Sequence, residues 1–162
     1  MSDLTPDELV TRTHDHLNRY ITLADNKASI LLTAQFAFLG LFANAMRILT
    51  IESELVWWCA LLGAGSGVIG VFLSGWIVYP KTPKPETGLI FWENIVEYGS
   101  VDAFQKSISD LEDGDTREQL VQENYELARV ASNKYHYLRW SLRFSGGMLI
   151  LFTIAAIDYL SF

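Results

Sequence analysis

The sequence predicts an all-α integral membrane protein with three transmembrane helices. Three observations lead to this class. Three long runs in the 162 residues carry no charged residue, at 28–46, 55–80 and 144–157. Lys and Arg are divided unequally among the segments between these runs. Aromatic residues that favour the lipid headgroup region stand near the ends of the runs. A soluble protein would bury all three runs as core helices, and the remaining residues are too few to cover them.

The first expected helix begins at a capping box and continues into the membrane. Thr5 and Glu8 form the box, and Pro6 suits the first helical position. No Pro or Gly follows before Gly40. One helix is therefore expected to start in the cytoplasm and become the first span. Its polar residue Gln35 is expected to hydrogen-bond to a neighbouring helix.

The second span is the longest uncharged run and carries small residues on one face. These are Gly63, Gly67, Gly70 and Ser74, at positions i, i+4, i+7 and i+11. Small residues at this spacing let helix backbones approach closely. The sequence predicts a helix-packing face here, either within the chain or between protomers.

The region between the second and third spans contains several turn signals. Prolines at 80–85 end the second span. The apolar stretch 88–99 suits either a strand or a helix. Ser100 is expected to cap a short helix, and a second capping box at 116–119 to start a long helix that enters the membrane. This last helix spans the membrane if Asp158 lies in the far headgroup region. The predicted organisation is a cytoplasmic helix at 1–27, spans at 28–46, 55–79 and 144–162, an external loop at 47–54, and a cytoplasmic region at 80–143. The first and third spans thus extend into the cytoplasm as long stalk helices, with a small cytoplasmic layer between spans two and three.

The basic residues predict the orientation. Eleven of the 12 Lys and Arg residues lie at 1–27 or 80–143, and only Arg47 lies in the loop at 47–54. Cytoplasmic loops of membrane proteins carry such an excess of Lys and Arg. We therefore expect a multi-pass inner-membrane protein with a cytoplasmic N-terminus and an external C-terminus.

Charge limits the possible partners. The net charge of −7 argues against binding to a nucleic-acid polymer, which needs a basic surface. Within the cytoplasmic region, residues 102–126 carry eight acidic and two basic residues, whereas residues 127–143 carry four basic residues and no acidic one. We call 127–143 the basic collar. It suits anionic lipid headgroups or the phosphate of a small ligand.

The sequence offers no catalytic or metal-binding arrangement. Cys59 is the single cysteine, which excludes a disulfide or a Cys-based metal site within the chain. His14 and His16 are two residues apart and so point to different faces of a helix. No nucleophile and base pair or phosphate-binding glycine loop is present. The chain is expected to have no enzymatic activity and no cofactor.

Polar residues near the mouths of the spans are expected to pair. Asp25 lies where the first helix enters the membrane, and Lys134 and Asn124 fall close to the apolar stripe of the last stalk. Buried polar groups need partners. A structural or switch pair between Asp25 and Lys134, or between Asp25 and Arg139, is therefore expected.

Three blocks of residues resemble the Pycsar effector transmembrane family. They are Asp25-Asn26-Lys27-Ala28 before the first span, Gly88-Leu89-Ile90-Phe91-Trp92 in the cytoplasmic region, and Asn133-Lys134-Tyr135 with Leu138-Arg139 before the last span. The blocks occur in the same order over nearly the whole chain. The resemblance implies an antiphage defence effector. A partner cyclase would make cyclic CMP or cyclic UMP, and the effector would sense it and compromise the inner membrane.

A cyclic nucleotide has an anionic phosphate and a flat base, which favour cationic and aromatic partners respectively. The candidate ligand-binding residues are Lys27, Phe91, Trp92, Lys134, Tyr135 and Arg139. An alternative is that the aromatic residues form the core of the cytoplasmic layer. Because three helices cannot enclose a pore, membrane disruption implies a homo-oligomer in the lipid bilayer. Two other functions remain open, a structural or adaptor protein whose cytoplasmic layer binds a protein partner, and a channel component gated in another way.

Overall fold

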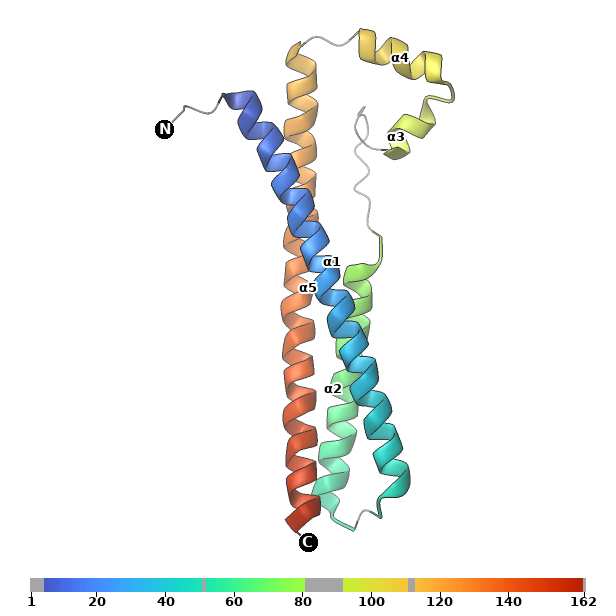
Figure 1. Ribbon diagram of the computed structural model, residues 1–162, viewed down its shortest axis with the longest axis vertical. Helices are drawn as coiled ribbons and strands as arrows, with labels where there is room; N and C mark the ends of the chain where they lie inside the picture. Colours follow the sequence, from blue (N-terminus) through green and yellow to red (C-terminus); the bar gives the residue numbers. More distant parts are fainter. Residues whose placement is uncertain (1–4, 51, 81–91, 111–112, 162) are drawn as a thin grey trace. The chain divides into compact units, whose positions relative to one another are not determined.

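Every regular element in the described residues, 5–50, 52–80, 92–110 and 113–161 of a computed structural model, is an α-helix (Figure 1). The helices are α1 (Pro6–Ile48), α2 (Glu54–Val78), α3 (Trp92–Glu97), α4 (Val101–Ser109) and α5 (Asp113–Ser161). Three of them, α1, α2 and α5, are long and apolar enough to cross a membrane. The predicted class, an all-α protein with three candidate spans, is confirmed.

Contacts divide the chain into two compact units. Unit 1 comprises residues 1–22 and 81–133, and unit 2 comprises residues 23–80 and 134–162. The long helices α1 and α5 each contribute residues to both units without a break. Backbone continuity of this kind is what the sequence predicted for the two stalk helices.

The start of α1 follows the predicted capping box. The Thr5 backbone N–H donates to Glu8 Oε2 at 3.1 Å, and the Glu8 backbone N–H donates to Thr5 Oγ1 at 3.3 Å. These two bonds satisfy donors that the first turn of a helix leaves without partners. From Pro6 the helix runs unbroken for 43 residues.

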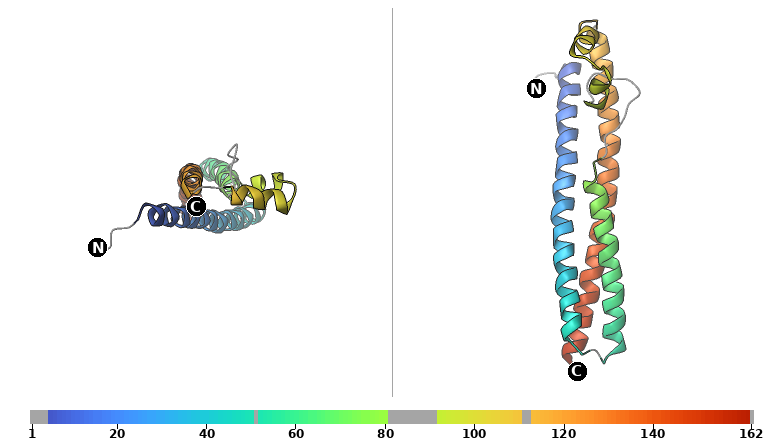
Figure 2. Two further views of the ribbon diagram at one scale, coloured as in Figure 1. Left: turned by 90° about the horizontal axis from the view of Figure 1, so that it is seen from above. Right: turned by 90° about the vertical axis from the view of Figure 1, so that its right-hand side faces the viewer.

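Unit 2 is a bundle of α1, α2 and α5 lying side by side (Figure 2). Two clusters of buried residues form its core. One contains Ala28, Ile77 and Leu138, and the other contains Val56, Cys59 and Ala155. Each cluster takes a residue from α2 and a residue from α5, so the apolar faces of these helices meet at two levels.

The end of the bundle that holds the α1–α2 loop is closed by a polar contact. Ser53 caps α2, and its hydroxyl donates to Asp158 Oδ2 at 2.6 Å. Asp158 therefore lies level with the start of α2, at the end of α5. The placement of Asp158 in the headgroup region stays a prediction.

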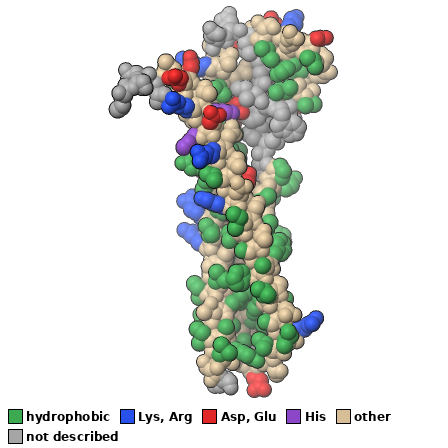
Figure 3. Space-filling view, in the orientation of Figure 1, with side chains coloured by type: hydrophobic (Ala, Val, Ile, Leu, Met, Phe, Trp, Pro, Cys, Tyr) green, Lys and Arg blue, Asp and Glu red, His purple; other side chains and the backbone are tan. Residues whose placement is uncertain are grey.

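The outer surface of unit 2 is strongly apolar. Large side chains with more than half of their surface exposed include Ile30, Phe36, Leu41, Phe72 and Ile150. Figure 3 shows apolar side chains spread along the visible face of this bundle, with few charges among them. A water-soluble protein rarely exposes an apolar surface of this extent, whereas a membrane protein presents it to lipid.

Unit 1 contains the N-terminal parts of α1 and α5, with α3 and α4. Leu127 and Ala131 of α5 are buried, as the apolar stripe predicted. Ser100 caps α4, because its hydroxyl accepts from the Ala103 backbone N–H at 3.2 Å. Of the ambiguous stretch 88–99, residues 92–97 form helix α3. Gly99 follows it with φ +68°, a conformation that favours glycine.

The start of α5 differs from the prediction. The helix begins at Asp113, so Thr116 lies within the first turn instead of capping it. Acidic residues such as Asp115 are favoured in this turn by the helix dipole. The proline segment from residue 81 to 85 lies outside the described residues, and the small cytoplasmic layer stays a prediction.

Candidate functional site

The structure brings Asp25 of α1 and Lys134 of α5 together as an ion pair within unit 2. Lys134 Nζ donates to Asp25 Oδ1. The Lys134 side chain is only 7% exposed and that of Asp25 is 34% exposed. Ala24 and Ala28, which flank Asp25 on α1, are fully buried. Among the described residues, the buried ammonium of Lys134 has Asp25, on a different helix, as its charged partner.

Lys27 and Arg139, the other predicted cationic ligands, are placed differently from Lys134. Both are exposed. Lys27 Nζ lies 5.9 Å from the centre of the Tyr135 ring, within the range of a cation–π contact. The structure thus pairs Lys27 with Tyr135 and Asp25 with Lys134. Phe91 and the side chain of Trp92 lie outside the described residues.

Lys134 is therefore already paired with Asp25 in this conformation. Its ammonium is buried and neutralised by Asp25, so a ligand phosphate would have to displace that carboxylate. Breaking a buried ion pair leaves an uncompensated charge and is costly. Of the three predicted cationic ligands, Lys27 and Arg139 are accessible from outside and Lys134 is not.

A buried polar network joins the three helices of unit 2. Gln35 Nε2 donates to Ser141 Oγ at 3.1 Å and to Ser145 Oγ at 2.6 Å. Ser141 Oγ lies 2.7 Å from Ser74 Oγ and donates to the Gly70 carbonyl at 3.0 Å. The expectation that Gln35 bonds a neighbouring helix is confirmed. In a lipid environment these bonds tie α1, α2 and α5 together at one level.

The small residues of α2 face the other two helices of the same chain. A Cβ atom on Gly63 would come within 2.5 Å of the Phe152 ring, and one on Gly67 within 2.5 Å of Met148 Sδ. A Cβ atom on Gly70 would lie 2.7 Å from Gln35 Nε2. The face is therefore filled within one protomer, and protomers of this conformation cannot meet through it.

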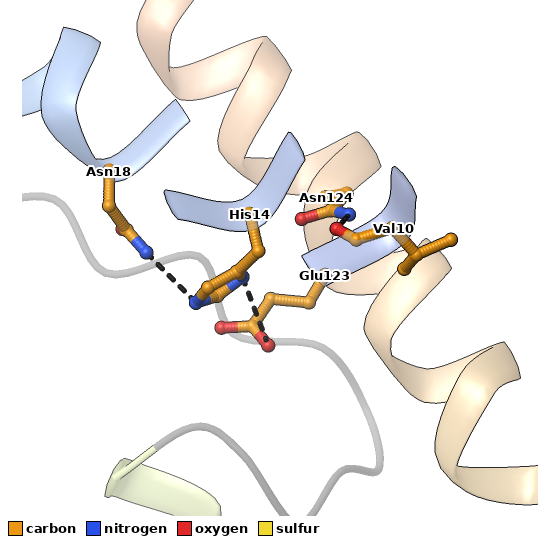
Figure 4. Close-up of polar contacts among 5 residues, drawn as sticks. All are labelled: Val10, His14, Asn18, Glu123 and Asn124. Atoms are coloured by element: carbon orange, nitrogen blue, oxygen red, sulfur yellow. Dashed lines mark hydrogen bonds and ion pairs between the residues drawn. The ribbon is translucent and has the colours of Figure 1, made fainter. Parts of the chain in front are cut away.

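Unit 1 contains a buried polar cluster between α1 and α5 that the sequence did not predict (Figure 4). Asn124 Nδ2 donates to the Val10 carbonyl at 2.9 Å. His14 Nδ1 lies 3.9 Å from Glu123 Oε2, and His14 Nε2 lies 2.9 Å from Asn18 Nδ2. Glu123 is 7% exposed and Asn124 is 8% exposed. We call His14, Glu123 and Asn124 the unit 1 polar cluster.

Burial raises the pKa of Glu123 above its usual value, and the charge of His14 opposes this rise. Three buried atoms of the cluster have no hydrogen-bond partner among the described residues: His14 Nδ1, Glu123 Oε2 and Asn124 Oδ1. Since nearly all buried polar groups in proteins are paired, such a concentration is unusual. The sequence signalled only Asn124, as a polar residue beside an apolar stripe, whereas Glu123 resembled an ordinary exposed helix residue.

Two comparisons with known proteins point to the same family. The Pycsar effector protein domain matches residues 9–160 of this chain. The Pycsar effector protein SaPycTM of Staphylococcus aureus is 30% identical over 135 residues, which cover 82% of this chain and 83% of the relative. No solved structure matches.

Proposed function

This chain belongs to the Pycsar effector family, and from that premise we propose that it senses cyclic CMP or cyclic UMP in the cytoplasm and then disrupts the inner membrane. Membership supports an antiphage defence role and a membrane setting. The cyclic nucleotide would be made by a partner cyclase. The protein would act by binding and conformational change, without catalysis.

The observation that carries the proposal is the continuity of α1 and α5. Each is a single helix that contributes to unit 1 and to the apolar bundle of unit 2. The Asp25–Lys134 pair joins the same two helices. A ligand that favours a different packing of α1 against α5 would therefore act directly on the helices that cross the membrane. Asp25 and Lys134 are the proposed switch pair.

Membrane disruption requires more than one protomer. The interior of the three-helix bundle is filled by side chains such as Gln35, Ile77 and Met148, each no more than about 1% exposed. A single bundle of this kind leaves no room for a pore. Because the small-residue face of α2 is already occupied, we propose that protomers associate through the exposed apolar surfaces of the bundle.

The proposed orientation follows the basic residues. The N-terminus and the region 80–143 lie in the cytoplasm, and the C-terminus lies outside. A reporter enzyme that is active only outside the cytoplasm should be active when fused after Phe162 and inactive when fused before Met1. The opposite pattern would contradict this orientation and with it cytoplasmic sensing.

The direct test uses the full chain, purified in detergent and reconstituted in dye-loaded liposomes. We expect calorimetry to show binding of cyclic CMP or cyclic UMP, and the bound nucleotide to release the dye. Cyclic AMP, with its larger purine base, is the control. Absence of binding by either pyrimidine nucleotide would exclude the proposed ligand class. It would favour the alternative, an adaptor whose cytoplasmic region binds a protein.

A further inference from the structure

Resting on the proposed function, we propose that the nucleotide binds along the seam between α1 and α5 in unit 1 and that the site selects the cytosine base. Its phosphate is bound by Arg117. Its base is bound by Glu123 and Asn124, which recognise the exocyclic amino group of cyclic CMP. This site differs from the one that the sequence favoured, at Lys27 and Lys134.

A cavity opens on this seam. Its volume is about 340 Å³, and it is lined by Asp7, Val10, Thr11, Thr116, Arg117 and Leu120. The volume lies within the range of small-molecule sites. The lining combines two apolar side chains with two threonine hydroxyls, one cation and one carboxylate, so it offers hydrogen-bonding groups to a sugar and one positive charge to a phosphate. The cavity lies wholly within unit 1.

Arg117 is available for a phosphate. Its Nε lies 3.5 Å from Asp7 Oδ1, and the two side chains are 51% and 76% exposed. An exposed ion pair of this kind contributes little to stability. Guanidinium groups bind phosphate oxygens through charge-assisted, often bidentate hydrogen bonds. A phosphodiester in the cavity can therefore take the place of Asp7 at low cost.

The unit 1 polar cluster lies further along the same contact between α1 and α5. On α5, Glu123 and Asn124 follow Leu120 at i+3 and i+4, and on α1 His14 follows Val10 at i+4. Residues at these spacings share a helix face. The rise along α5 from Arg117 to Asn124 is about 10 Å. This is close to the reach of a mononucleotide from its phosphate to the far edge of its base.

The atoms of the cluster that have no hydrogen-bond partner among the described residues determine which base fits. Asn124 Nδ2 is bonded to the Val10 carbonyl, so its free atom, Oδ1, is an acceptor. Glu123 Oε2 lies 3.9 Å from His14 Nδ1 but has no hydrogen-bond partner among the described residues, so it is a second acceptor when ionised. A carboxylate is a suitable partner for the amino group at position 4 of cytosine. Uracil has a carbonyl oxygen at that position, which would face two acceptors and gain no hydrogen bond.

These acceptors are buried, so the base reaches them only when α1 and α5 move apart locally. The ligand thus binds better to the conformation in which α1 and α5 are locally apart than to the one in which they are packed together. A ligand shifts an equilibrium by its difference in affinity for the two states. Recognition of the base and the change in helix packing are in this way a single event.

The test is titration calorimetry on the full chain in detergent. We expect the wild type to bind cyclic CMP about tenfold or more tightly than cyclic UMP, the effect of one mismatched hydrogen bond to a charged group. Glu123→Gln should remove most of this preference. Arg117→Gln should weaken both nucleotides about tenfold. Glu126→Gln is the matched control, because Glu126 lies on the same helix and pairs with Arg129, away from the cluster.

The outcomes separate this inference from the proposed function. Equal affinities in the wild type, or an unchanged preference in Glu123→Gln, would overturn the cytosine site while leaving nucleotide sensing intact. Weaker binding in Lys27→Gln with no effect of Arg117→Gln would move the site to the mouth of the spans. Binding of neither nucleotide by the wild type would overturn both proposals. The unfolding midpoint of each variant, measured in parallel, shows whether a loss of affinity comes from a loss of fold.

Discussion

Lys134 is buried against Asp25, and this pair connects the first and last long helices of the chain. The two residues are 109 positions apart in sequence. The lysine is almost completely enclosed while the aspartate keeps about a third of its surface exposed. Water can therefore reach the acidic partner first, and the pair is opened from the Asp25 side. It is one of three charge contacts between the described residues of α1 and α5, and the contact can exist in two states, joined and separated.

Removing one partner of this pair should destabilise the protein much more than exchanging both. We expect Asp25→Asn to lower the free energy of unfolding by about 3 kcal/mol, because it leaves the Lys134 ammonium buried without a counter-charge. The double variant Asp25→Lys with Lys134→Asp should recover a large part of that loss. Thermal unfolding in detergent measures both. Additive losses in the double variant would show that the contact contributes nothing.

The glycines of α2 provide a matched pair of substitutions. Gly63→Ala places a methyl group within 2.5 Å of the Phe152 ring, whereas Gly65→Ala meets no atom within 4 Å. We expect Gly63→Ala to destabilise the bundle by about 1–3 kcal/mol through overpacking. Gly65→Ala should be neutral or slightly stabilising, since alanine favours helix. Equal effects of the two substitutions would mean that α2 does not pack on α5 through this face.

The Gln35 network should contribute a small but coupled stabilisation. Gln35→Leu removes the bonds to Ser141 and Ser145, and it also removes a buried oxygen, Oε1, that has no partner among the described residues. We expect a net loss of about 1 kcal/mol. Ser145→Ala in the Gln35→Leu background should cost clearly less than in the wild type. Asn44→Leu, at an exposed position of the same helix, is the control and should have little effect.

Glu123 should make the stability of the protein depend on pH. Because burial raises its pKa, the folded state binds this proton more tightly than the unfolded state. The contribution to stability is therefore favourable at acidic pH and is lost as pH rises through the folded pKa. His14 is the charged group that faces Glu123 from α1 and opposes the shift.

Glu123→Gln stays neutral at every pH, so we expect it to be more stable than the wild type at neutral pH by about 1 kcal/mol. The difference should disappear below the usual pKa of a glutamate. Unfolding midpoints of both proteins across this pH range measure the effect, with Glu126→Gln as the reference for a partly exposed glutamate. A destabilised Glu123→Gln at neutral pH would show that the ionised carboxylate has a partner in the folded protein.

Local patterns in the sequence were sufficient for the long helices of this protein. Long uncharged runs, together with the apolar residues that flank them, predict spans, and three candidate spans are present. The capping residues Thr5 and Ser100 act within four residues of themselves, so their positions could be predicted directly. The boundary of α5 was placed four residues late, because Thr116 was expected to precede the first helical residue whereas the helix begins at Asp113.

Contacts between helices depended on the rotation and register of each helix, which no local pattern specifies. The sequence left Asp25 with two candidate partners, and the structure pairs it with Lys134 while Arg139 is exposed. It allowed the small-residue face of α2 to pack within or between chains, and the structure fills that face from α1 and α5. Glu123 is acidic in an acidic segment and gave no sign of burial. Its place beside His14 arises only when two segments more than a hundred residues apart are packed together, because burial is a property of the assembled helices and not of either one.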